Sequence, residues 1–294
     1  MWKKIDWSDG YITYSGELPN YLYRYRSISM QNIDRLIDFE LCDEAIYLAG
    51  LSELNDPNEG RFLVRFSENI SDIKSFFFER MENEYPNISQ RRIEAEKCAL
   101  RVVLSEFKPN PEIIKDYRDK IGQVFRVACF TEDCLNKPMW ASYAKFIDKE
   151  KMIDRAGLCI EYRIDESFRS LNLHPVDYTD SVPIVRVDKD IKDFSNKIFY
   201  IKHSSWSYEK EWRVSSVLQA TYPFEKILTT NSKLRLESSI NAIIFGEYTP
   251  FSIIKKIFEK VNKANPLVEF KQVFYDDDLQ ELSVKTINLS KMQR

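Results

Sequence analysis

The sequence predicts a mixed α+β fold, with a mixed or antiparallel β core, flanking helices and a helical insertion. Short runs of aromatic and β-branched residues, which suit strands, recur along the chain, and stretches with helical spacing separate them. Their order lacks the regular βαβ alternation of a doubly wound sheet. Because 294 residues suffice for one large core, we expect a single domain over residues 1–294.

The composition argues against several functional classes. A hydrophobic fraction of 44%, with 14% aromatic residues, is too high for a disordered chain. Only 7 glycines argue against a glycine-rich phosphate cradle. A net charge of −3 does not support a protein that holds nucleic acid mainly through its phosphates. It is still compatible with a local basic groove.

The sequence contains no apolar run near the roughly 18 to 20 residues of a membrane span, and no signal-peptide stretch at its start. We therefore expect no membrane association and a cytoplasmic location. The five cysteines are scattered and odd in number, so we interpret them as reduced thiols. They are Cys42, Cys98, Cys129, Cys134 and Cys159.

Residues 71–121 form a charge-dense block with helical spacing, which we interpret as a helical insertion. An apolar stripe falls on one face of a long helix there, and Glu96 and Lys97 interrupt it, so we expect its first half to be only partly buried. Pro109 and Pro111 end this helix. The stripe consists of Ile93, Leu100, Val103, Leu104 and Phe107.

The remaining segments alternate between the two types of structure. We expect Ser29 to cap a helix that follows the first strand. We expect Thr249 to cap the helix that precedes the last strand. A short helix over 139–144 separates two central strands. The expected strands are 22–26, 44–48, 123–130, 157–162, 206–214, 242–245 and one that begins at 268.

Glu209 and Glu211 are the first candidate site residues. In a strand, a spacing of two residues places both carboxylates on one face, beside Arg213. Such a pair can bind a sugar hydroxyl and stabilise positive charge at an anomeric carbon. The alternative, which spacing alone favours, is a solvated edge strand with an ordinary ion pair between Glu211 and Arg213.

The strand over 22–26 gives the second candidate group. Arg24 and Arg26 would share one face, and Tyr23 and Tyr25 the other. Arginine side chains suit a phosphate or diphosphate, and tyrosine rings suit a flat base or a nicotinamide ring. The alternative is an exposed basic edge whose tyrosines lie in the core.

Two further pairs are weaker candidates. Asn55 and Asp56 precede Pro57, and at minimum this triplet predicts a turn. Trp140 and Tyr143 lie three residues apart on a short helix, where such residues pack more often than they bind a ligand.

The histidines and cysteines do not indicate a metal site or a catalytic triad. His174 and His203 are far apart, and neither has a cysteine or histidine at ligand spacing. Cys129 and Cys134 have no second pair beside them, and no nucleophile-elbow sequence is present. We therefore predict no metal in the site.

The order of these motifs resembles a bacterial family known only as domain of unknown function 2971. The resemblance spans about residues 22–247, and the order of the motifs, not any one of them, carries it. The motifs are Leu22–Ser27, Leu54–Pro57, Ala128–Thr131, Met139–Ala144, Gly157–Tyr162 and Trp206–Arg213.

That family's plan is in turn similar to the plan of the ADP-ribosyltransferases, enzymes that use NAD as a substrate. The likeness implies that Arg24 holds the NAD ribose or phosphate, that Ser52 supports the nicotinamide side, and that Glu211 stabilises the oxocarbenium-like ribose. Glu209 would be the second acidic residue. The expected NAD-binding residues are Arg24, Tyr25, Arg26, Ser52, Asn55, Asp56, Trp140 and Tyr143.

We weigh three functional hypotheses. The first is an NAD-cleaving or ADP-ribosylating enzyme that acts on an unknown macromolecular target, as a toxin or an antiphage defence effector. The second is a metal-dependent nuclease effector that uses Asp56, Glu209 or Glu211 with a divalent cation. The third is a non-enzymatic interaction or sensor domain. Convergence of Arg24 and Glu211 on one hollow would favour the first.

Overall fold

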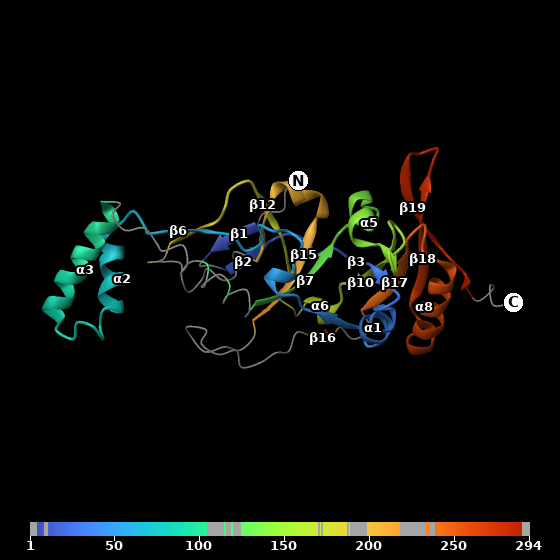
Figure 1. The fold of residues 1–294 in the computed structure, drawn as a ribbon, viewed down its shortest axis with the longest axis horizontal. Helices are drawn as coiled ribbons and strands as arrows, with labels where there is room; N and C mark the ends of the chain where they lie inside the picture. The colour runs from blue at the N-terminus through green and yellow to red at the C-terminus, as the bar shows by residue number, and fades with distance from the viewer. Residues whose placement is uncertain are drawn as a thin grey trace.

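The computed structural model describes residues 5–8, 11–104, 115, 119, 125–169, 171, 173–186, 188, 199–217, 233–235 and 239–289. Helix accounts for 33% and strand for 32%, which confirms the predicted mixed α+β class. An eight-stranded sheet forms the centre, and β17 and β18 are its one parallel pair of neighbours (Figure 1). Its strands, in order across the sheet, are β11 (Leu173–Pro175), β15 (Glu211–Val217), β7 (Phe125–Thr131), β3 (Tyr21–Arg26), β10 (Leu158–Arg163), β17 (Ile240–Phe245), β18 (Glu269–Asp276) and β19 (Glu281–Thr286).

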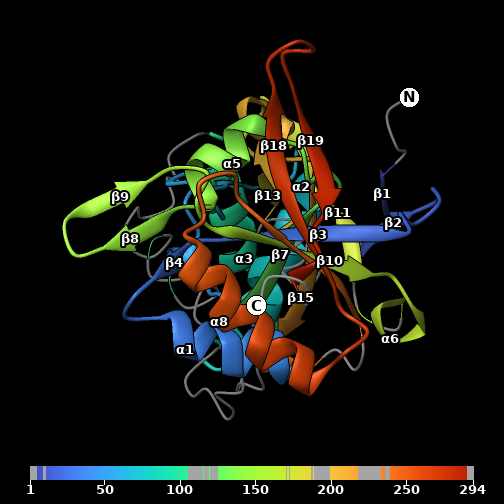
Figure 2. The ribbon, with the colours of Figure 1, turned by 90° about the vertical axis from the view of Figure 1, so that its right-hand side faces the viewer.

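Helices cover both faces of this sheet (Figure 2). The first face is covered by α8, α1 and a π-helical segment, η1, which continues α1. The second face is covered by α5. Their bounds are α8 (Phe251–Ala264), α1 (Ile33–Arg35), η1 (Leu36–Cys42) and α5 (Lys137–Tyr143).

Alternate residues of the central strands enter two separate apolar clusters. On β10, Ile160 belongs to the cluster that contains Ile257 of α8, and Cys159 belongs to the cluster that contains Trp140 of α5. All four side chains are fully buried. The sheet is therefore an inner layer between two helical layers, as its nearly continuous apolar strands require.

Smaller elements surround this sheet. The paired strands are β1 (Ile5–Ser8) with β2 (Tyr11–Tyr14), β5 (Ala45–Tyr47) with β16 (Lys233–Arg235), β6 (Leu63–Arg65) with β13 (Ile184–Arg186), and β12 (Asp177–Thr179) with β14 (Ile201–His203). A three-stranded sheet contains β4 (Ile28–Ser29), β8 (Phe146–Asp148) and β9 (Lys151–Ile153). The short helices are η2 (Leu51–Glu53), α6 (Glu166–Arg169) and η3 (Ser204–Glu209).

The helical block contains a hairpin of α2 (Ile70–Arg80) and α3 (Ile88–Val103), at one end of the molecule away from the sheet (Figure 1). Its small side chains Ala95 and Ala99, together with Arg91, are buried. We expected the apolar stripe to be buried, with only its first half partly exposed, and this is wrong because α3 packs through its opposite side. The stripe residues Ile93, Leu100, Val103 and Leu104 are exposed, and Phe107 lies outside the described residues.

Two predicted helix caps are also wrong. Ser29 ends the short strand β4, and α1 begins only after Asn32. Thr249 does not cap α8, because its hydroxyl donates instead to the carbonyl of Gly157 at 2.8 Å. In the part of the chain that the structure describes, no helix is long and apolar enough to cross a membrane.

Gly157 holds the end of α5 against the sheet, because its N–H donates to the Ala144 carbonyl at 2.8 Å. A Cβ atom at position 157 would lie 2.4 Å from the carbonyl oxygen of Arg26 and 2.7 Å from the carbonyl carbon of Ala144. We therefore expect Gly157→Ala to lower the free energy of unfolding in urea by about 1–3 kcal/mol. Exposed Ser142→Ala is the control, and equal unfolding midpoints for both variants would contradict this packing.

Candidate functional site

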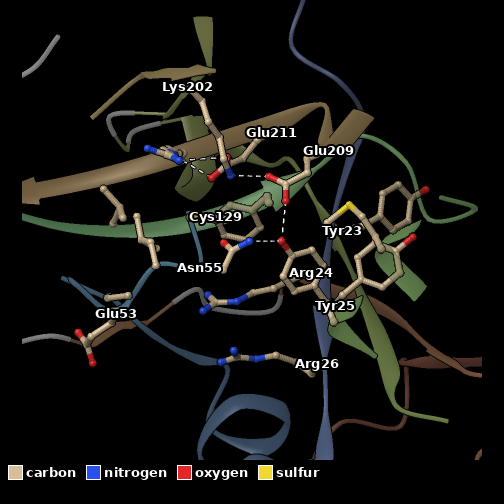
Figure 3. A pocket seen from close by; sticks show the side chains of 17 residues that line it. Tyr23, Arg24, Tyr25, Arg26, Glu53, Asn55, Cys129, Lys202, Glu209 and Glu211 are labelled. Atoms are coloured by element: carbon tan, nitrogen blue, oxygen red, sulfur yellow. Dashed lines mark hydrogen bonds and ion pairs between the residues drawn. The ribbon is translucent and has the colours of Figure 1, made fainter. Parts of the chain in front are cut away.

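A cleft opens where two central strands separate. β3 and β7 are paired only at Tyr23 and Thr131. Further along β7, Val127 instead forms a bridge with Ala49, which follows β5. The cleft between the separated strands has a volume of about 340 Å³ (Figure 3).

Seven of the ten predicted site residues line this cleft. They come from β3, from the loop after η2, from α5, and from the junction of η3 with β15. These residues of one cleft are therefore up to 187 positions apart in the sequence, from Arg24 to Glu211. The seven are Arg24, Tyr25, Arg26, Asn55, Tyr143, Glu209 and Glu211.

The other three do not line it. Ser52 is exposed on η2. Asp56 is buried, and its Oδ1 accepts a hydrogen bond from the Asn58 N–H at 2.8 Å, so it serves the turn. Trp140 is fully buried with its ring centroid 5.1 Å from that of Tyr25, which leaves no ring face for a ligand.

On β3, arginines and tyrosines alternate as predicted. Tyr25 packs on Trp140, whereas Arg24 and Arg26 both contact Glu40 of η1 on the other side. The Arg26 Nε donates to Glu40 Oε2 at 2.6 Å, and the Arg24 Nε lies 3.5 Å from Glu40 Oε1. The alternative of an exposed basic edge is wrong, because β3 lies between β7 and β10 and the Arg24 side chain is only 10% exposed.

Arg24 lines the cleft, and its guanidinium group is not fully hydrogen-bonded. Its Nη2 donates to the Tyr47 carbonyl at 3.3 Å, but its buried Nη1 has no hydrogen-bond partner among the described residues. Burial, together with the neighbouring Arg26, lowers the pKa of Arg24 from its ordinary value. Arg24, Arg26 and Glu40, which we call the basic cluster, have a formal charge of +1 from two cations and one carboxylate.

The acidic pair reaches the cleft by a different backbone route from the predicted one. A single strand over 206–214 is wrong, because Glu209 ends the helix η3 and β15 begins at Glu211. Between them Lys210 is left-handed, with φ 45°. This turn redirects the backbone, and both carboxylates still converge on one cation.

That cation is Lys202 of β14, which Figure 3 shows between the two glutamates. Its Nζ lies 2.5 Å from Glu209 Oε2 and 3.0 Å from Glu211 Oε2, and all three side chains are at most 5% exposed. Lys202 was not predicted from the sequence, because a single lysine in a polar segment carries no periodic signal. The ammonium group holds two like charges together that would otherwise repel each other.

Arg213 completes the network behind Glu211. All five of its N–H groups donate: two to Glu211, two to Glu59 and one to the Phe199 carbonyl, at 2.6 to 3.1 Å. The ion pair between Glu211 and Arg213 that we expected on a solvated edge does form, but it is buried on an interior strand. We call Glu59, Glu209, Glu211, Lys202 and Arg213 the acidic cluster; three carboxylates and two cations give a formal charge of −1.

These contacts fix the protonation of Glu211. Burial alone would raise the pKa of Glu211, but Arg213 and Lys202 outweigh it and lower the pKa to about 2. Burial would likewise lower the pKa of Lys202, and Glu211 and Glu209 raise it instead. Glu211 is therefore a carboxylate at neutral pH and cannot act as a general acid there.

Tyr143 connects the acidic cluster to the opposite loop. Its hydroxyl donates to Glu209 Oε1 at 2.6 Å and accepts a hydrogen bond from the Asn55 side chain. Burial and the adjacent Glu209 raise the pKa of Tyr143, so the phenol stays protonated at neutral pH. Burial and Glu211 also raise the pKa of Cys129, which lines the cleft as a thiol and not as a nucleophilic thiolate.

The arrangement does not favour the nuclease hypothesis. The ammonium group of Lys202 occupies the space between Glu209 and Glu211, where a divalent cation shared by these two carboxylates would have to lie. Asp56, the third proposed ligand, serves a turn and does not line the cleft. Within the described residues, no three or more His, Cys, Asp or Glu side chains gather closely enough to hold a metal ion.

Comparison with protein-family models, with curated proteins and with solved structures finds no match for this chain. The resemblance to a bacterial family of unknown function and the looser likeness to ADP-ribosyltransferases therefore stay predictions. The function of the chain must be inferred from the geometry and the charges of the cleft.

Glu211→Gln tests the buried network through its pH dependence. Because the folded-state pKa is depressed, the carboxylate stabilises the fold above its unfolded pKa of about 4.3, and this contribution is lost as the pH falls towards 2. We expect the variant to lose about 3–5 kcal/mol in free energy of unfolding at pH 7, and this deficit to shrink between about pH 5 and pH 2. Urea unfolding at several pH values measures both.

Exposed Glu269→Gln is the matched control, with stability near that of the wild type throughout. A deficit for Glu211→Gln that stays constant down to pH 2 would show that the carboxylate is not ionised by its neighbours.

Proposed function

We propose that the chain binds NAD in the cleft between β3 and β7 and breaks its nicotinamide–ribose bond, passing ADP-ribose to a macromolecule or to water. The observation that supports this most directly is that two arginines and two carboxylates line opposite sides of one cleft (Figure 3). Arg24 and Arg26 lie on the β3 side, and Glu209 and Glu211 lie on the other side together with Lys202 and Arg213. NAD carries an anionic diphosphate and a cationic pyridinium ring, so its own charges match this polarity.

The basic cluster suits the diphosphate. Arg24 and Arg26 both line the cleft, and the Arg24 Nη1 has no hydrogen-bond partner among the described residues. Arginine forms charge-assisted, bidentate bonds with phosphates, which gives orientation as well as affinity.

A second cavity of about 610 Å³ adjoins the cleft, which gives room for an extended ligand. The two cavities share four lining residues, namely Tyr25, Arg26, Glu53 and Tyr143. A dinucleotide that spans both would place its two halves in different cavities. Volumes of this size are usual for small-molecule sites.

The acidic cluster suits the reacting ribose. When the C–N bond breaks, its electron pair neutralises the pyridinium nitrogen, and positive charge develops on the ribose until a nucleophile adds and loses its proton. Negative charge fixed beside this carbon stabilises the transition state. Glu209 is the better placed carboxylate, because it faces one cation, Lys202, whereas Glu211 is shared by Lys202 and Arg213.

Release of nicotinamide from NAD, followed by chromatography with and without candidate target proteins, tests the proposal. We expect Glu209→Gln to lower the rate about 100-fold, because it removes the charge and keeps the shape. Arg24→Gln should mainly weaken NAD binding in calorimetry. Exposed Glu269→Gln is the matched control and should react at the wild-type rate.

Unfolding curves recorded on the same samples separate a lost activity from a lost fold. If the folded wild type neither binds NAD nor releases nicotinamide with any target, the proposal is wrong. Equal rates for the wild type and Glu209→Gln would remove this carboxylate from the mechanism.

A further inference from the structure

Helix α3 carries an apolar stripe on the side away from its packed alanines. Ile93, Leu100 and Leu104 are 55%, 46% and 66% exposed. Their spacings of seven and four residues place them on one side of the helix, and Val103, 53% exposed, borders them. No described residue covers this stripe.

Such a stripe differs from the scattered exposed apolar residues that every surface contains. Side chains that recur at this spacing along a helix form the seam by which one helix packs against another. Figure 1 shows the α2–α3 hairpin at one end of the molecule, beyond the sheet, where a second helix can approach it.

We propose that this stripe is a homodimer interface, in which α3 pairs antiparallel with α3 of a second copy. The two hairpins then form a row of four helices, with the two α3 helices in the middle and the apolar stripe buried between them. A twofold axis makes the surface self-complementary, because each residue contact occurs twice. This proposal does not depend on the NAD proposal.

The charges on one flank of the stripe favour this orientation, and the two Lys97 side chains beside the axis oppose it only weakly at an exposed site. A twofold axis that places Ile93 midway between Leu100 and Leu104 of the second copy passes between positions 97 and 98. The same axis places Glu94 opposite Arg101 of the second copy, on one flank of the stripe. Antiparallel pairing therefore forms two symmetric ion pairs.

In the single chain, Arg101 and Glu94 can still pair with a second copy. Arg101 has no ion-pair partner among the residues that the structure describes. Among the described residues, Glu94 pairs only with Lys97 of its own helix, at 2.8 Å, and such an i,i+3 pair is weak at an exposed surface. On the other flank, Glu96 already pairs with Lys74 of α2.

Sedimentation equilibrium of the full chain over a range of concentrations tests the proposal. We expect the wild type to dimerise, and Leu100→Glu to raise the dimer dissociation constant at least about tenfold, because it places a charge in the apolar seam. Leu267→Glu is the matched control, since Leu267 is 87% exposed outside this helix, and its dissociation constant should equal the wild-type value. Circular dichroism checks that the variants keep their helices.

Charge reversal tests the orientation separately. Glu94→Arg and Arg101→Glu should each weaken the dimer about three- to tenfold, and the double variant should restore it. A wild type that stays monomeric at every concentration overturns the proposal, as does a dimer that Leu100→Glu leaves unchanged. A double variant no stronger than either single variant overturns the antiparallel register.

Discussion

Lys202, buried between Glu209 and Glu211, is the interaction on which the geometry of the cleft depends. Two carboxylates with no cation between them would repel each other, and burial would favour their neutral forms. The ammonium group holds both, and Arg213 neutralises the remaining charge of Glu211 from behind. Such a network contributes little net stability, because removing its charges from water costs about as much as their attraction returns. Its effect is a fixed arrangement of charge.

The separation of β3 from β7 places these fixed charges in the same cleft as Arg24. Glu211 pairs with Thr131 of β7, and Thr131 pairs with Tyr23, so these three side chains lie in one row on one face of the sheet. Arg24, one residue further along β3, points to the other face. In a continuous sheet the backbone would lie between Arg24 and Glu211. Because the two strands part there, the arginine and the carboxylate line the same cleft.

Local patterns predicted the elements that have strong patterns of their own. The alternating β3, the helix α5 and the amphipathic α8 were all expected from sequence, because each depends on spacing within one segment. The junction between η3 and β15 was not expected from the sequence. Its left-handed residue is Lys210, and not the glycine or asparagine that usually indicates this conformation. The apolar stripe of α3 also predicted the wrong packed side of this helix. α2 packs against the opposite side, where the small alanine side chains let the two helices approach more closely than leucines would.

Part of the candidate site was likewise predicted from the sequence, and part of it was not. That an arginine of the first long strand and a late glutamate share one hollow followed from the order of the motifs. The partners that fix them did not, because Glu40, Glu59 and Lys202 stand in segments without periodic signals and meet only through long-range packing. Trp140 was included among the ligand-binding residues because the sequence of a short helix does not show which of its side chains are buried.

A double-mutant cycle between Lys202→Met and Glu209→Gln tests the central claim most directly. Urea unfolding of the wild type, both single variants and the double variant at pH 7 gives the coupling free energy. If the buried lysine bridges the acidic pair, the double variant is more stable than the sum of the single losses predicts, by at least about 1 kcal/mol. Losses that add to within about 0.3 kcal/mol would show that the two side chains do not hold each other.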